Sequence, residues 1–268
     1  MGHFADASRH SPLTSQIDVL TRDLAWTLAN FTFVANATTL VSECDIAHSP
    51  AMSVASCRTM PQPALAFIGD SPDLLATYST FLTDPGHTVD LLVNDAQRSV
   101  VERAFHVDAV VPKWQLVFRG EVEALQAGRA AELVENDWPV MEALAKGEHF
   151  PLRGYGDDVF RHGPAFGIWD KRKLVAMGMT TVEIPGAAQI DNVVTRREYR
   201  RQGLATDVTA ALVVANALRG MRAFAVVSQD NEPAIALFRK LRFDCERPMY
   251  AMHCLIRDPD HLKDALGV

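Results

Sequence analysis

The sequence predicts an α/β (α+β) protein in which a mixed, mostly antiparallel sheet is flanked by helices. Short apolar runs rich in β-branched residues alternate with segments of helical periodicity. Three of the later apolar runs follow one another with only short turns between them, which is typical of antiparallel hairpins. The composition, 48% hydrophobic and 22% charged over 268 residues, is that of a globular chain with a sizeable core.

Charge and cysteine content narrow the class of protein. The formal net charge of −7 argues against a general nucleic-acid binder and favours a cationic or amine partner. The four cysteines show no zinc-ligand spacing and are too few for a disulfide framework, so we predict no metal site and a reducing, cytoplasmic setting. No uncharged apolar run approaches the ~20 residues that a bilayer span needs, and we expect no membrane partner. Homodimer formation is left open.

The first part of the chain is expected to form a domain of its own, over residues 1–120. Residues 11–47 have mostly helical periodicity, and residues 49–63, rich in Ser and Pro, predict a loop. After them we predict a strand over Ala64–Gly69, a helix over Ser71–Leu82 with Ser71 as its N-cap, a strand over Thr88–Val93, a helix over Asp95–Phe105 and an extended segment over Ala109–Phe118.

The rest of the chain is expected to form a second domain, over residues 121–268. Residues 121–146 predict a helix with a break at Pro139, followed by a loop over 147–163. We then predict three strands joined as hairpins, over residues 165–170, 174–184 and 187–195, a helix over 203–218, a strand over 223–228, a helix over 231–241 and a last strand within 245–255.

The stretch from Asn192 to Thr206 runs from an apolar strand end through a basic turn into a glycine that opens a long helix. Backbone N–H groups at a helix N-terminus point the same way, and the helix dipole there favours an anion. Gly203 and Ala205 keep bulky side chains away from this turn. The stretch is therefore predicted to hold a phosphate group.

The order of these elements resembles the GCN5-related N-acetyltransferase (GNAT) superfamily over roughly residues 165–254. The most specific parts are Val193-Val194-Thr195, the pattern Arg200-x-x-Gly203-x-Ala205, and the run Asn231-Glu-Pro-Ala to Phe243. The resemblance implies the GNAT fold and direct transfer of an acetyl group from acetyl-CoA to a primary amine in a ternary complex. The acceptor would be a small molecule, a protein N-terminus or a lysine. The alternative is a CoA-binding regulatory or scaffold module without turnover.

The same resemblance assigns the donor site. The turn would bind the pyrophosphate of acetyl-CoA through main-chain N–H groups, with added charge from the arginines. The strand end would leave backbone groups for the pantetheine amides and the thioester carbonyl, and the asparagine would contact the cofactor arm. The expected donor-binding residues are Val193, Val194, Thr195, Arg200, Arg201, Gln202, Gly203, Leu204, Ala205, Thr206, Asn231 and Phe238.

Proton transfer is less closely specified by the resemblance. Phe238 stands where many family members have a tyrosine that protonates the departing thiolate, and a phenyl ring cannot donate a proton. Tyr250 and Cys245 are the nearest other donors in the sequence. For the base that takes a proton from the ammonium substrate, Asp191 and Glu183 on the central strands are the candidates.

The first part of the chain also contains a fainter copy of the second, at an offset of 136 residues, as in Pro112 against Pro248 and Asp95 against Asn231. We therefore expect residues before about Gly120 to form a degenerate GNAT-like half. Because this half lacks the Arg-x-x-Gly-x-Ala pattern, it is expected to bind no CoA.

Overall fold

The computed structural model describes residues 44–49, 52–57, 64–68, 71–82, 86–150, 152, 160, 163–184 and 186–256. The chain divides into two compact units, the first formed by Met1–Lys113 with Pro248–Val268 and the second by Trp114–Arg247. Two long strands, β5 (His106–Phe118) and β11 (Phe243–Leu255), each contribute residues to both units. The boundaries between the two units therefore fall within β5 and within β11, whereas the sequence suggested one boundary after residue 120.

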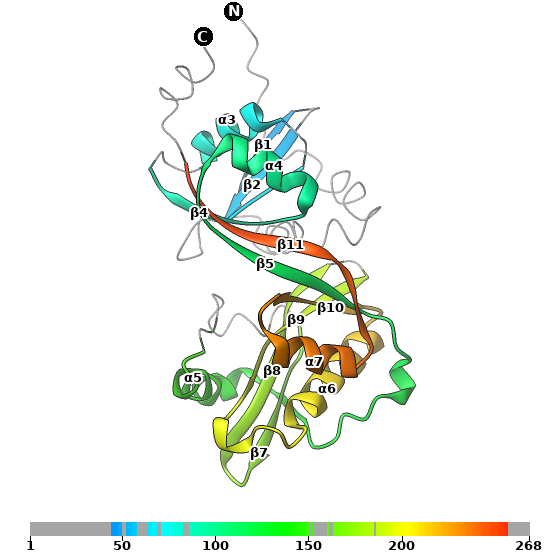
Figure 1. Ribbon diagram of the computed structural model, residues 1–268. Coiled ribbons are helices and arrows are strands. Elements are labelled where there is room, and N and C mark those ends of the chain that lie inside the picture. Colours follow the sequence, from blue (N-terminus) through cyan, green and yellow to red (C-terminus); the bar gives the residue numbers. More distant parts are fainter. Residues whose placement is uncertain are drawn as a thin grey trace, which may run out of the picture. The chain divides into compact units, whose positions relative to one another are not determined.

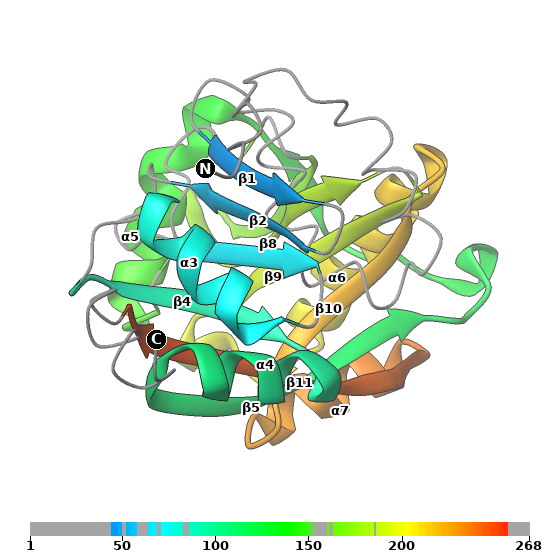
Figure 2. The ribbon, with the colours of Figure 1, turned by 90° about the horizontal axis from the view of Figure 1, so that it is seen from above.

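The first unit is a mixed sheet with two helices packed against it (Figure 2). Its strand order is β1 (Cys44–Ser49), β2 (Met52–Cys57), β3 (Ala64–Ile68), β4 (Thr88–Val93) and the end of β11. Neighbouring strands are antiparallel except β3 and β4, which are parallel. The helices α3 (Pro72–Leu82) and α4 (Asp95–Ala104) build a core with β4 and β11, in which Leu75, Val101 and Phe105 meet Met252 and Cys254.

The second unit is a sheet with helices on both faces (Figure 1). Its strand order is β6 (Ala131–Leu133), β7 (Ala165–Asp170), β8 (Lys173–Ile184), β9 (Ala187–Thr195), β10 (Arg222–Ser228) and the end of β5. The strands from β6 to β9 are antiparallel to their neighbours, and β9 and β10 are parallel.

Two separate cores fill the space between this second sheet and its helices. Helix α5 (Trp138–Gly147) packs its Met141 and Leu144 against Met177 and Met179 of β8. Helices α6 (Leu204–Leu218) and α7 (Glu232–Lys240) form the other core, which includes Ala176 of β8. Because successive side chains of β8 enter different cores, the two helical layers lie on opposite faces of the sheet.

Most elements match the sequence prediction within a few residues, and Ser71 caps α3 as expected, since its Oγ accepts the N–H of Leu74 at 3.3 Å. The single helix predicted over residues 121–146 is wrong. This segment holds a 3-10 turn, η1 (Val122–Ala124), the short strand β6, a second turn, η2 (Glu135–Asp137), and only then α5. Pro139 lies in the first turn of α5, where its missing N–H is tolerated, so it begins the helix and does not break one.

Residues 44–57 also differ from expectation. Strand β1 begins at Cys44, inside the segment predicted as helix, and β2 occupies part of the predicted loop. Their polar and small residues carry little strand signal, and the pairing of β2 with β3 outweighs local propensity here. The remainder of the predicted first helix, and most of the loop over 147–163, lie outside the described residues.

The two parts of the chain repeat one order of elements. In each, three antiparallel strands lead to a helix, a strand parallel to the third, a second helix and a long last strand. Helices α4 and α7 end at Ala104 and Lys240, which keeps the offset of 136 residues. The last strand of each part pairs with the sheet of the other part. Strand β11, from the second part, lies beside β4, and strand β5, from the first part, lies beside β10. This shared order supports the proposal that the first part is a degenerate copy.

Candidate functional site

The parallel strands β9 and β10 separate part of the way along their length. Their ladder begins with Arg222 opposite Ala187 and ends with Phe224 opposite Gln189. Strand β9 continues to Thr195 and β10 to Ser228, yet these described stretches form no further pair with each other. The predicted residues Val193, Val194 and Thr195 lie in the separated part of β9. Backbone groups on this edge are open to another partner, because unpaired N–H and C=O groups require one.

A bulge in β9 lies where the strands separate. Asn192 adopts a left-handed backbone with φ of 52°, and the register with β8 shifts between Met177 and Met179. The buried amide of Asn192 donates to Sδ of Met179 at 3.4 Å. Asparagine is among the few residues that adopt this conformation readily. The bulge bends β9 just before the residues predicted to contact the donor.

The turn between β9 and α6 has the geometry of an anion site. After the 3-10 turn η4 (Arg197–Tyr199), Arg201 and Gly203 have φ of 65° and 80°. Left-handed residues that alternate with right-handed ones direct successive N–H groups toward one point, and α6 adds the positive end of its dipole there. A Cβ placed on Gly203 would meet no atom within 4 Å among the described residues, so they leave the space above the turn open. A diphosphate fits such a turn.

Glu148 accepts hydrogen bonds from two residues of the segment between β9 and α6. Its Oε2 accepts Nη2 of Arg200 at 2.7 Å, and its Oε1 accepts the backbone N–H of Arg197 at 3.1 Å. Nε of Arg200 donates to the carbonyl of Thr195 at 3.1 Å. The Glu148 side chain is only 10% exposed. Sequence reasoning missed Glu148, because it follows α5 and approaches the turn only in the folded chain.

Arg129 is a second contact that the sequence did not indicate. Its Nη2 donates to the carbonyl of Gln202 at 3.2 Å and pairs with Oδ2 of Asp207 at 3.2 Å. The preceding Gly128 allows this approach, since a Cβ there would lie 2.5 Å from Cγ of Asp207. Arg129 thus places a positive charge beside the turn, from a segment that was expected to be helical.

The two residues predicted on α7 differ in their surroundings. Asn231 is the N-cap of α7, and its Oδ1 accepts the N–H of Ala234 at 3.2 Å. Phe238 is 4% exposed, and its ring meets that of Phe243 edge to face with centroids 4.9 Å apart. Phe238 is therefore a core residue, and its contact with the donor remains a prediction.

Of the two candidate bases, Asp191 lies where the strands separate. It directly precedes the bulge, and its carboxylate accepts the N–H of Asn192 at 2.8 Å and the amide of Gln189 at 3.3 Å. Glu183 lies opposite Ala188, in the part of β9 that still pairs with β10. Both of its oxygens bind the guanidinium of Arg219 at the end of α6. Of the two candidates, Asp191 lies closer to the separated strands, whereas the Glu183 carboxylate is engaged in an ion pair with Arg219.

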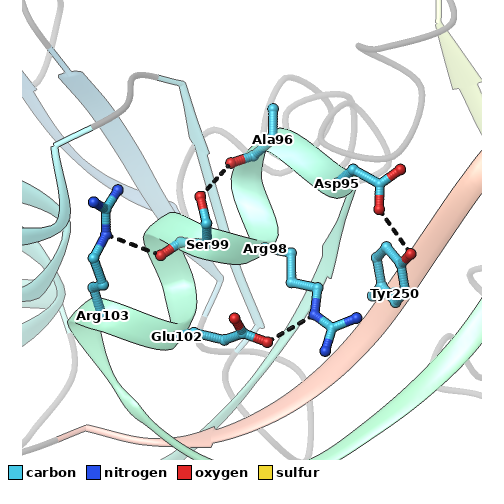
Figure 3. A network of polar contacts seen from close by, with 7 residues as sticks. All are labelled: Asp95, Ala96, Arg98, Ser99, Glu102, Arg103 and Tyr250. Atoms are coloured by element: carbon cyan, nitrogen blue, oxygen red, sulfur yellow. Dashed lines mark hydrogen bonds and ion pairs between the residues drawn. The ribbon is translucent and has the colours of Figure 1, made fainter.

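Tyr250 belongs to the first unit, whereas the other candidates belong to the second. Its hydroxyl donates to Oδ1 of Asp95 at 2.7 Å, and the guanidinium of Arg98 lies 4.7 Å from the ring centroid (Figure 3). The hydrogen bond to Asp95, together with burial, raises the pKa of Tyr250. These contacts tie β11 to the start of α4 and do not join Tyr250 to β9 or the turn.

The part of the chain that the structure describes contains no helix that is long and apolar enough to cross a membrane. It also contains no group of three or more His, Cys, Asp or Glu side chains arranged to hold a metal ion.

Sequence comparison matches residues 165–250, from β7 into β11, to the family described as FR47-like protein. Alpha/beta-tubulin-N-acetyltransferase 9 from Mus musculus is 34% identical over 71 residues, which are 26% of this chain. The match spans only 30% of the mouse protein's length.

Solved structures share the fold over most of the chain. A GNAT-family protein from Novosphingobium aromaticivorans has a TM-score of 0.63 at 22% identity, covering 85% of this chain and 97% of its own. A GCN5-related N-acetyltransferase from Kribbella flavida has a TM-score of 0.59 at 16% identity, covering 88% of this chain and 98% of its own. The predicted fold class is confirmed. The chain therefore has the fold of these GNAT-family structures, and its residues 165–250 are similar to the FR47-like family.

Proposed function

We propose that this protein transfers an acetyl group from acetyl-CoA to a primary amine by direct attack in a ternary complex. The observation that carries the proposal is the separation of β9 from β10 beside the anion-binding turn. The turn from Arg200 to Thr206 binds the pyrophosphate, and the open edge of β9 pairs with the pantetheine amides. A backbone N–H of Val193–Thr195 stabilises the charge that develops on the thioester oxygen.

The amine nitrogen attacks the thioester carbon, the carbon–sulfur bond breaks, and CoA leaves as a thiolate. Asp191 takes the proton that the amine loses, directly or through a water molecule. The replacement Asp191→Asn should lower kcat while CoA binding stays near the wild-type value. A matched replacement, Glu183→Gln, disrupts the ion pair with Arg219 and should act on stability more than on kcat. If kcat is equal in wild type and Asp191→Asn, the assignment of Asp191 fails.

The acceptor is proposed to be an amine of a peptide or protein, with a small amine as the second class. The name of the mouse relative refers to tubulin, which indicates a protein acceptor for that protein, and the extension to this chain is our proposal. We also place the reaction in the cytoplasm, an assignment supported by the free thiols of Cys245 and Cys254.

Release of the CoA thiol from acetyl-CoA, measured across a panel of peptide amines and small amines, tests this function. CoA binding is followed separately by the shift in unfolding temperature. Turnover with at least one amine supports the proposal. Tight CoA binding without turnover for any amine would indicate a regulatory or scaffold module instead. The residue at position 238 is consistent with that alternative, because phenylalanine offers no proton donor. If the protein shows neither CoA binding nor turnover, the assignment of the donor site is refuted.

A further inference from the structure

Arg129 connects two parts of the segment around the start of α6. Its Nη2 donates to the carbonyl of Gln202 at 3.2 Å, and its Nε and Nη2 each lie 3.2 Å from Oδ2 of Asp207. The guanidinium is planar with fixed donor directions, so it can hold a carbonyl and a carboxylate in a set arrangement. The Arg129 side chain is 58% exposed, and ion pairs at such exposure contribute little to stability. Stability alone therefore does not account for this contact.

The residues around Arg129 bring it close to α6. Leu125 and Ala130 pack against the core that α6 shares with the sheet, so the chain is anchored on both sides of the arginine. Gly128 has φ of 57°, and a Cβ on it would lie 2.5 Å from Cγ of Asp207. A glycine is needed at this position, because any side chain would push the segment away from α6.

The carbonyl that Arg129 binds belongs to a peptide group of the anion-binding turn. The C=O of Gln202 and the N–H of Gly203 share one planar trans peptide group, so they point in opposite directions. Glycine adopts several backbone conformations at little cost, so Gly203 by itself does not fix the direction of this group. The N–H of Gly203 has no partner among the described residues. The bond from Arg129 to the carbonyl therefore fixes the direction of an N–H that is open to a ligand.

Asp207 places a negative charge close to the same turn. Its backbone N–H donates to the carbonyl of Gly203 at 3.0 Å, in the first turn of α6. An unpaired carboxylate at this place would repel a bound pyrophosphate. The ion pair with Arg129 offsets this charge, and it also orients the guanidinium that binds Gln202.

We propose that Arg129 is a positioning residue for the donor, which aligns the N–H of Gly203 with the pyrophosphate of CoA by holding the carbonyl of Gln202. An N–H bond to a charged oxygen is strong only when donor and acceptor are aligned. Because Nε and Nη2 of Arg129 are engaged with Gln202 and Asp207, its effect passes through the backbone of the turn. This inference rests on the proposed function, since it takes CoA as the ligand of the turn.

Three variants of the full chain separate positioning from charge. Arg129→Met removes the hydrogen bonds to Gln202 and Asp207 and leaves the carboxylate unpaired. The double variant Arg129→Met with Asp207→Asn removes the hydrogen bonds but keeps the net charge of the wild type. The matched control is Arg119→Met, which removes another exposed arginine of the second unit, paired with Glu246 on β11.

Binding of CoA and of dephospho-CoA is measured by calorimetry, beside the unfolding temperature. Dephospho-CoA keeps the pyrophosphate and lacks the 3′-phosphate. We expect both Arg129 variants to bind the two ligands about tenfold or more weakly, and by the same factor, because an aligned bond to the pyrophosphate is lost. The unfolding temperature should fall by no more than about 4 °C, and Arg119→Met should bind both ligands like the wild type.

Steady-state assays give a second readout that general damage to the fold would not reproduce. The KM for acetyl-CoA should rise about tenfold in the Arg129 variants, with kcat within about twofold of the wild type. The kcat/KM for S-acetylpantetheine, which has no pyrophosphate, should stay unchanged.

The inference is overturned if the double variant binds CoA as tightly as the wild type, because Arg129 would then act only by offsetting the charge of Asp207. It is also overturned if CoA alone loses affinity, which would indicate direct contact with the 3′-phosphate, if Arg119→Met causes an equal loss, or if the wild type does not bind CoA. In each case, turnover of acetyl-CoA by the wild type leaves the proposed function standing. Conversely, the expected losses of affinity, together with no turnover of any amine, support the role of Arg129 and contradict the transferase proposal.

Discussion

Replacement of Gly203 by valine should abolish donor binding while the protein stays folded. Gly203 has φ of 80° and begins α6. A left-handed backbone costs a residue with a side chain about 1–2 kcal/mol, and a Cβ here meets no atom within 4 Å, so no clash adds to this strain. For a chain of this size we expect the unfolding temperature to drop by about 2–8 °C. The fold should therefore survive.

The effect on CoA affinity should be much larger. The valine side chain would occupy the open space above the turn, where the phosphate must approach the backbone N–H groups. Each hydrogen bond to a charged group contributes about 1.5–3 kcal/mol. Loss of two such bonds weakens binding between about 100-fold and 10,000-fold.

Gly220 provides the matched control at the other end of α6. It has φ of 74°, and a Cβ on it also meets nothing within 4 Å, so Gly220→Val carries the same strain away from the turn. CoA affinity of both variants is measured by calorimetry beside their unfolding temperatures. Unchanged affinity in Gly203→Val, or an equal loss in Gly220→Val, would refute the assignment of the turn.

Three further outcomes are expected. Glu148→Gln removes the charge that holds Arg200 and should raise the KM for acetyl-CoA about fivefold, with kcat within about twofold; an unchanged KM in steady-state assays would count against this role. Asn216→Ala leaves the buried Thr180 hydroxyl unpaired and should lower the free energy of unfolding by at least about 1–3 kcal/mol in denaturant titrations, while a change within error would contradict the pairing. Burial raises the pKa of the Cys254 thiol to about 12, so it should resist alkylation at pH 8 until the protein unfolds, and native labelling detected by mass spectrometry would contradict this.

The pKa of Cys254 also gives a direction for stability at high pH. Unfolded thiols ionise near pH 9, whereas the folded protein keeps this proton up to about pH 12. Between these values the unfolded chain binds fewer protons than the folded protein, so stability falls as the pH rises.

The elements around the turn were predictable because their signals are local. A β-branched run, a glycine with an open approach and an asparagine cap all lie within the segment that they shape. The same local information misassigned residues 121–146, where Gly128 and Pro139 mark a turn and a helix start inside a polar stretch with helical periodicity.

The groups that support the site could not be read from the sequence. Glu148 and Arg129 reach the turn through contacts 52 and 73 residues away along the chain, and neither contact leaves a local pattern. The echo at an offset of 136 residues was the only sequence signal that β5 and β11 are equivalent strands.

The sharing of β5 and β11 between the units has a consequence for synthesis of the chain. The strand that pairs with β4 includes Tyr250, which lies 155 residues beyond its partner Asp95. At ribosomal rates of about 5–20 residues per second, the edge of β4 stays unpaired for about 10–30 s until β11 has been synthesised. Unpaired strand edges recruit other chains. Translation speed and chaperone access therefore affect the yield of folded protein, and the first unit is the last to be completed.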